Sequence, residues 1–309
     1  MEIMQVSFTH PTYLWNLIIV PFLVFFYFLS LKYSKSFSLK FANFVALSRV
    51  SGGVNEPSIV YVLIIRTVAL ICIILSISGM TLWYVGETDN KDYVLAIDVS
   101  SSMMQADFFP NRLDAAKEAA INFVESIPFT SRVALLTFSG TSFVDQPLTL
   151  EKNLVVNAIK NLTSNSVGGT DIGNAVITSS NLLLSSKKAK VIILLTDGRS
   201  NIGVSEDTAI AYAIDSHVVV NTVGIGNLED NEFNLGINQE ELKDLSDFTL
   251  GTSYIATTPE ELEEIYLEIG NGTKTSNIPW DLSFILLILA LVLLVSDWLL
   301  GDTIYRRIP

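Results

Sequence analysis

Three long runs of apolar residues stand out along this 309-residue chain. They cover residues 14–31, 58–85 and 282–300, and an α-helix needs roughly 20 such residues to cross a bilayer. We therefore expect a transmembrane helix at each of these three ranges. The first run is preceded by Glu2 but by no Lys or Arg, and no small-residue cleavage site follows it. This pattern favours a retained span over a secretory signal peptide.

The positive residues around these runs predict an orientation. Lys and Arg are enriched in the cytoplasmic loops of membrane proteins, and here they gather at Lys32, Lys35, Lys40, Arg49, Arg306 and Arg307. We therefore expect 32–57 to be a cytoplasmic loop and 301–309 a cytoplasmic tail, with 1–13 and 86–279 on the outer side. Arg66 lies inside the second run. Because 67–85 is already long enough to span, we expect the Arg66 side chain to extend to the inner boundary.

Between the second and third runs, short apolar runs alternate with segments of helical periodicity. Runs that are apolar throughout, such as 191–196 (VIILLT), indicate strands buried on both faces. The predicted strands are 93–98, 133–138, 143–148 (an edge strand), 191–196, 218–223 and 254–256, and the predicted helices are 112–127, 154–162, 172–184, 207–215, 239–248 and 259–269. Such alternation predicts an α/β fold with a doubly wound, mostly parallel sheet flanked by helices. Ligands in these folds bind at the carboxyl ends of the strands.

Charge narrows the classes of ligand. Residues 84–279 contain 12 Lys or Arg and 27 Asp or Glu, whereas the rest of the chain contains 7 and 5. An acidic outer domain argues against nucleic acid as a ligand, since phosphate binding needs a basic face; the same acidity also serves solubility. The one cysteine, Cys72, lies in an apolar run, and two histidines are too few for a histidine-based zinc site.

Oxygen-bearing side chains gather where two predicted strands end and where one helix begins. They are Asp98, Ser100, Ser102, Thr170 and Asp197. Two carboxylates and three hydroxyls suit a hard divalent cation, with Mg²⁺ expected and Mn²⁺ or Ca²⁺ as alternatives. Gly168 and Gly169 would let the backbone approach the ion closely. Ser, Thr and Asp also act as N-caps and turn residues, which accounts for each position alone but not for all five together.

The order of these residues resembles a known site. Asp-x-Ser-x-Ser at 98–102, Thr170 and Thr-Asp-Gly at 196–198 resemble the metal-ion-dependent adhesion site of von Willebrand factor A domains, and the likeness covers about residues 90–270. It implies that Ser100, Ser102 and Thr170 are direct ligands, and that Asp98 and Asp197 bind directly or through water. It also implies that an open coordination position accepts an acidic side chain of a partner protein.

A second resemblance covers nearly the whole chain. The opening FTHPTYLWNLIIVPFL, the phrases DFFPNRLDAAKEA and FSGTSFVDQPLT, and the placement of the three apolar runs resemble BatA-type proteins of the bacterial aerotolerance group; BatB-type relatives share this layout. The resemblance implies a multi-pass protein of the bacterial cytoplasmic (inner) membrane with a periplasmic A domain. The implied partners are other Bat proteins and a MoxR-type AAA+ ATPase. The segment after Ile225 is shorter than in many relatives.

The predicted function is therefore metal-dependent binding of a protein partner in an envelope complex for stress tolerance or protein assembly, without catalysis. A surface-facing adhesin or receptor is the first alternative. A metal-dependent hydrolase is the second, with Asp171 as its candidate base. A nucleophile–base pair of Ser100 or Ser102 with His217 is not favoured, because the chain has no GxSxG elbow.

Overall fold

The computed structural model describes residues 5–34, 59–86, 88–164, 168–198, 200, 202–226, 239–271 and 276–299. The chain divides into two compact units, one built mainly from residues 84–279 and the other from 4–83 and 280–309. Each unit is described below by itself.

A six-stranded sheet forms the centre of the larger unit. Its strands are β3 (Lys91–Asp98), β4 (Val133–Phe138), β5 (Ser142–Thr149), β6 (Ala189–Thr196), β7 (Val218–Ile225) and β8 (Ser253–Ala256), in the order β5-β4-β3-β6-β7-β8. Every neighbouring pair is parallel except β4 with β5. This confirms the predicted mostly parallel sheet, including the edge position of 143–148.

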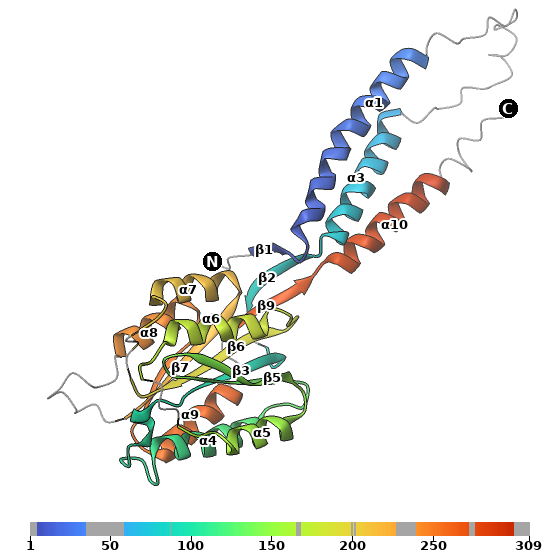
Figure 1. Ribbon diagram of the computed structural model, residues 1–309. Helices are drawn as coiled ribbons and strands as arrows, with labels where there is room; N and C mark the ends of the chain where they lie inside the picture. Colours follow the sequence, from blue (N-terminus) through green and yellow to red (C-terminus); the bar gives the residue numbers. More distant parts are fainter. Residues whose placement is uncertain are drawn as a thin grey trace, which may run out of the picture. The chain divides into compact units, whose positions relative to one another are not determined.

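Helices cover both faces of this sheet (Figure 1). One face carries α4 (Arg112–Ser126), α5 (Lys152–Lys160) and α9 (Pro259–Asn271), and the other carries α6 (Ile172–Leu183), α7 (Glu206–Asp215) and α8 (Gln239–Phe248). Each layer buries its own apolar core against the sheet. Strands such as β3 and β6 are buried along their whole length, which explains why their sequences are apolar without alternation.

The order of strands reverses beside β3. The chain runs from β3 outward to β4 and β5, and then returns to β6 on the other side of β3 before continuing to β7. Connections leave β3 and β6 in opposite directions, so the carboxyl ends of these two strands flank the point where ligands bind in open α/β sheets. Asp98 is the last residue of β3, and Asp197 follows β6 directly.

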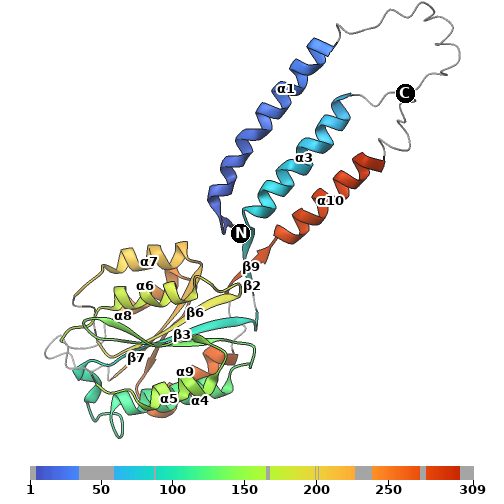
Figure 2. The same ribbon diagram turned by 45° about the vertical axis from the view of Figure 1, so that its right-hand side comes forward.

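The smaller unit contains the apolar helices. A 3-10 turn η1 (Pro11–Ile18) leads into α1 (Ile19–Ser34), and α3 (Ile59–Ile77) contacts both α1 and α10 (Ser283–Leu299) (Figure 2). Within the described residues, one helical stretch, Pro11–Ser30, is long and apolar enough to cross a membrane, while Tyr61–Ile77 and Ser283–Leu299 are apolar but shorter. A membrane anchor is thus supported at the first predicted span, and the other two spans stay predictions.

The helix predicted at 58–85 is wrong in its last third. α3 ends at Ile77, and the chain then enters β2 (Met80–Gly86). Gly79 adopts φ +70°, a left-handed conformation that ends a helix and suits glycine. The residues that follow include Thr, Trp, Tyr and Val, which favour strands. β2 joins β1 (Gln5–Phe8) and β9 (Ser276–Asp281) in a small sheet of order β1-β2-β9, which the sequence pattern did not predict.

Arg66 also differs from its prediction. Because α3 stops at Ile77, Arg66 lies well inside the helix, and its Nε donates to Asp297 Oδ2 of α10 at 2.9 Å. Ser76 Oγ donates to the carbonyl of Ser283 at 2.7 Å, so α3 contacts α10 near both ends of α10. The predicted cytoplasmic loop beyond residue 34 and the tail 301–309 lie outside the described residues, as does the segment 227–238.

Candidate metal site

The first part of the site is the turn that follows β3. A short 3-10 helix, η2 (Ser101–Met104), begins directly after Ser100, and its Met103 is fully buried in the core. Anchoring by Met103 holds the turn in place. The Ser100 amide donates to Asp98 Oδ1 at 2.8 Å, and the Ser100 and Ser102 hydroxyls lie 3.0 Å apart. The three residues of the Asp-x-Ser-x-Ser motif therefore form one hydrogen-bonded cluster.

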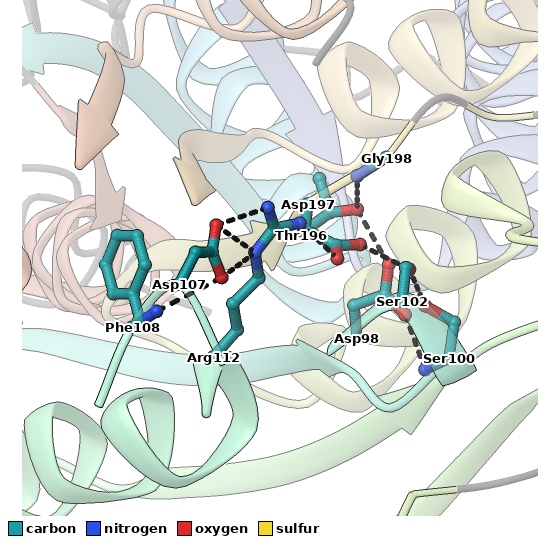
Figure 3. A network of polar contacts seen from close by, with 9 residues as sticks. All are labelled: Asp98, Ser100, Ser102, Asp107, Phe108, Arg112, Thr196, Asp197 and Gly198. Carbon is teal, nitrogen blue, oxygen red and sulfur yellow. Dashed lines mark hydrogen bonds and ion pairs between the residues drawn. The ribbon is translucent and has the colours of Figure 1, made fainter. Parts of the chain in front are cut away.

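The second part comes from the end of β6, the neighbouring strand (Figure 3). Ser102 Oγ donates to Asp197 Oδ1 at 2.8 Å, and Thr196 Oγ1 donates to Asp98 Oδ2 at 2.7 Å. The Gly198 amide donates in turn to Thr196 Oγ1 at 3.2 Å. A hydroxyl that gives its proton to a carboxylate keeps its lone pairs for another partner. Ser102 is therefore oriented to offer an oxygen to a cation.

Thr170 reaches the same place from the loop before α6. A Cβ built on Gly198 would lie 4.0 Å from Thr170 Oγ1, which puts the threonine hydroxyl beside the Thr-Asp-Gly turn. Gly169 adopts φ +95°, so glycine is required there by conformation. A Cβ on Gly168 would meet no protein atom within 4 Å, and the expected close approach of the backbone to the ion there stays a prediction.

The Asp171 side chain caps the amino-terminal end of α6. It is the N-cap of α6, and its Oδ1 accepts from the Asn174 amide at 2.9 Å and from the Val204 amide at 3.3 Å. Gly203 packs directly against this carboxylate, since an added Cβ would overlap Asp171 Oδ2 at 1.8 Å. These contacts give Asp171 Oδ1 a structural role as a helix cap.

The serine–histidine pair that the sequence does not favour is separated by the length of the sheet. His217 directly precedes β7, whereas Ser100 and Ser102 follow β3, and β3, β6 and β7 run parallel. His217 thus lies at the amino-terminal edge of the sheet and the serines at the carboxyl-terminal edge. Nucleophilic catalysis by this pair is excluded.

Two polar residues of the site were not among the predicted ones. Arg112, the first residue of α4, donates from Nη1 to Asp197 Oδ2 at 2.8 Å and from Nη2 to Asp107 Oδ2 at 2.6 Å. Its hydrogen bonds hold the pKa of the Asp107 carboxyl below its ordinary value. A signal was present in the sequence: an arginine at the positive end of a helix is unfavourable unless carboxylates surround it.

Burial and the negative charge of a neighbouring carboxylate raise the pKa of Asp98. Its side chain is fully buried, and desolvation, reinforced by the negative charge of Asp197, raises its pKa to about 6 despite the hydrogen bonds from Ser100 and Thr196. An ionised carboxylate in such a place lowers the stability of the folded protein by about 2–3 kcal/mol at neutral pH. A cation bound among these oxygens would offset this loss of stability by neutralising the carboxylate charge.

This leads to a pH prediction for the metal-free protein. Because the pKa of Asp98 is raised on folding, its contribution to stability is favourable below about pH 4 and is lost as the pH rises through about 6. We expect the melting temperature of the protein in EDTA to be about 5 °C higher at pH 5 than at pH 7.5 because of Asp98. We also expect added Mg²⁺ to stabilise the protein more at pH 7.5 than at pH 5.

Other groups titrate in the same range, so a matched comparison is needed. Burial and acidic neighbours, Glu241 foremost, raise the pKa of Glu206 to about 7, and burial lowers the pKa of His217. Melting curves of Asp98→Asn and of the wild type in EDTA isolate the Asp98 contribution. The prediction fails if Asp98→Asn keeps the same pH dependence as the wild type.

The donor set fits a hard divalent cation. Among the described residues, no group of three or more His, Cys, Asp or Glu side chains is placed to hold a metal ion, so a cation here would also need hydroxyl ligands. The site instead offers two carboxylates with serine and threonine hydroxyls, all of them oxygen donors, as Mg²⁺ and Mn²⁺ prefer. With Arg112 beside Asp197, one positive side chain already lies among three negative ones.

Comparison with known proteins agrees with this geometry. Residues 93–199 match the von Willebrand factor type A domain. The larger unit has the von Willebrand factor type A fold. The match contains all five predicted metal-site residues.

Relatives and solved structures extend the likeness. A UPF0353 protein of Mycobacterium bovis is 27% identical over 98% of this chain and 96% of its own length. An aerotolerance-related membrane protein of Bacteroides fragilis is similar in structure, with a TM-score of 0.51 and 21% identity over 59% of this chain and 98% of that one. Proximal thread matrix protein 1 of the mussel byssus, described with a zinc-occupied MIDAS motif, gives a TM-score of 0.52 and 23% identity over 62% of this chain and 47% of that one.

Proposed function

We propose that the A domain binds a divalent cation, Mg²⁺ in the first place, and through it an acidic side chain of a partner protein. The observation that carries this proposal is the joined hydrogen-bond network of Asp98, Ser100, Ser102 and Asp197. Thr170 lies beside it, near Gly198. All five of these residues were predicted as ligands, although the first and the last lie almost a hundred positions apart in the sequence. The zinc in the metal site of the mussel protein supports a divalent ion at the equivalent place here.

The ion supplies positive charge and an open coordination position when bound. The chain's own residues do the rest: Asp98 and Asp197 provide negative charge, Ser100, Ser102 and Thr170 provide neutral oxygens, and Thr196 holds the Asp98 carboxylate in place. The proposed role is binding and not catalysis. The rival hydrolase would need a base near the ion, and its candidate, Asp171, is engaged as the cap of α6.

We further propose that the chain is anchored in the bacterial inner membrane by three spans, with the A domain on the periplasmic side. At about 1.5 Å per residue, α3 and α10 are about 25–28 Å long, close to the thickness of a bilayer core. The pairing of Arg66 with Asp297 supports this placement, because charged residues inside spans are expected to pair. We also propose, from the resemblance of its sequence to BatA-type proteins, that the chain works in an envelope complex with other Bat proteins and a MoxR-type ATPase.

Crosslinking in native membranes tests the proposed function. Membranes containing the full-length chain are treated with crosslinker in Mg²⁺ or in EDTA, and the captured proteins are identified. We expect an envelope protein to be captured in Mg²⁺, to disappear in EDTA, and to be lost with Asp98→Asn. Asp247→Asn, an exposed change of the same chemical kind on α8, serves as the matched control. Equal capture in all of these samples would contradict a metal-dependent contact.

A further inference from the structure

Arg112 is the one cationic side chain within the candidate metal site as the structure describes it. Its side chain is 7% exposed, and it donates to the fully buried carboxylate of Asp197 on one side and to Asp107 on the other. Three hydrogen bonds join the guanidinium to Asp107, two from Nε at 2.9 and 3.0 Å and one from Nη2 at 2.6 Å. Bidentate contacts of this kind fix the guanidinium strongly.

The fold makes room for the guanidinium. Gly226, at the end of β7, adopts φ +142°, and a Cβ built there would lie 3.2 Å from Arg112 Nη2. The Asp107 turn is held from the core side by Phe108, which is 2% exposed. Arg112 is therefore seated between two strand ends and one anchored turn. Its position beside Asp197 is a fixed feature of the domain.

The charges of the site show what Arg112 does there. Asp98, Asp107 and Asp197 carry three negative charges, and Arg112 carries one positive charge. The net charge of the empty site is thus near −2, which a single divalent cation would neutralise. Asp197 uses both oxygens within the protein, since Oδ1 accepts from Ser102 and Oδ2 accepts from Arg112. A cation that approaches Asp197 is attracted by the carboxylate and repelled by the guanidinium.

We propose that Arg112 is an internal counter-ion that stabilises the metal-free A domain and lowers the affinity of the site for a divalent cation. Without Arg112, Asp98 and Asp197 would face each other as buried charges with no cation nearby. With it, the domain folds before metal arrives, and metal binding stays reversible. This inference rests on the proposed metal site, and it adds the residue that sets the strength of binding.

Asp107 modulates this effect from the edge of the site. Its side chain is 35% exposed, and it shares the guanidinium with Asp197. Loss of its charge would leave the positive charge of Arg112 less compensated and would raise the net charge of the site toward −1. Loss of the Arg112 charge would lower it toward −3. The two substitutions therefore change cation affinity in opposite directions, a result that simple damage to the site would not produce.

The test uses the full-length protein in detergent, titrated with MgCl₂ or MnCl₂ by calorimetry and melted in EDTA. We expect Arg112→Gln to bind the ion about tenfold more tightly and to melt at a lower temperature in EDTA, and Asp107→Asn to bind about tenfold more weakly. Arg132→Gln is the matched control. Arg132 pairs with the buried Asp92, which begins β3 at the opposite end from Asp98. We expect that change to lower stability equally with and without metal and to leave the affinity unaltered.

Several outcomes would overturn the inference. Weaker or equal binding by Arg112→Gln contradicts it, as does tighter or equal binding by Asp107→Asn. If Arg112→Gln does not fold in EDTA, its melting in saturating MgCl₂ decides the question: a fold recovered with metal supports the counter-ion role, and failure to fold in both conditions contradicts it. If the wild type binds no cation, the proposed function itself is contradicted. If the wild type binds a cation and both variants bind it with the same affinity, only the role of Arg112 is contradicted.

Discussion

Replacement of Asp98 by Asn is expected to weaken Mg²⁺ binding by at least about a hundredfold without unfolding the domain. Asp98 contributes one of the two carboxylates of the site, and a full charge is lost from a buried position where screening is weak. Calorimetric titration of the full-length protein in detergent measures the change. Mn²⁺ is a useful second probe because it prefers the same oxygen donors.

The same variant should be at least as stable as the wild type in the absence of metal. The ionised Asp98 carboxylate is costly at neutral pH, as its raised pKa of about 6 shows. Asn keeps one acceptor for the Ser100 amide, and the Thr196 hydroxyl can turn to accept from the new NH₂ group. Asp247→Asn should leave both affinity and melting temperature unchanged. A strongly destabilised Asp98→Asn would show that Asp98 is a structural residue.

Replacement of Asp92 by Ala is expected to produce the largest loss of stability, about 3–5 kcal/mol. Asp92 is fully buried near the start of β3, and its carboxylate accepts from Arg132 Nη2 at 2.6 Å and from Ser186 Oγ at 2.6 Å. Burial alone would raise the pKa of this carboxyl, but the hydrogen bonds from Arg132 and Ser186 hold it below the ordinary value. Removal of the carboxylate leaves these donors without their acceptor.

Thermal unfolding in detergent, followed by circular dichroism, measures this effect, because all four tryptophans lie outside residues 84–279. The expected loss corresponds to a fall in melting temperature of about 10 °C. Cation affinity should be unaltered, because Asp92 and Asp98 lie at opposite ends of β3. Asp247→Ala is the matched control and should melt like the wild type. A fall of less than about 2 °C for Asp92→Ala would show that this buried network contributes little.

The central sheet could be predicted from the sequence because its strands are buried on both faces. Runs such as 191–196 contain only apolar residues up to a polar end, so both the element and its limit are visible. The end of α3 could not be predicted in the same way. Residues 80–85 continue the apolar run of the helix, and the left-handed turn at Gly79 and a local change to strand-favouring residues are the signals that separate the two.

The oxygen donors of the candidate site could be predicted from the sequence, but its counter-ion, Arg112, could not. Asp98, Ser100, Ser102 and Asp197 stand at strand ends, where the parallel topology brings them together. Arg112 comes from the start of a helix on one face of the sheet, and its reach toward Asp197 depends on side-chain conformation and on the space beside Gly226. Such a contact is set by packing and leaves no periodic signal in the sequence.

The most direct test of the account is the location of a bound Mn²⁺ ion in crystals of the protein, by anomalous scattering. The account predicts a single strong peak enclosed by the oxygens of Asp98, Ser100, Ser102, Thr170 and Asp197, and no peak there in crystals of Asp98→Asn. A wild-type crystal grown in excess Mn²⁺ that shows no ion among these side chains would contradict it.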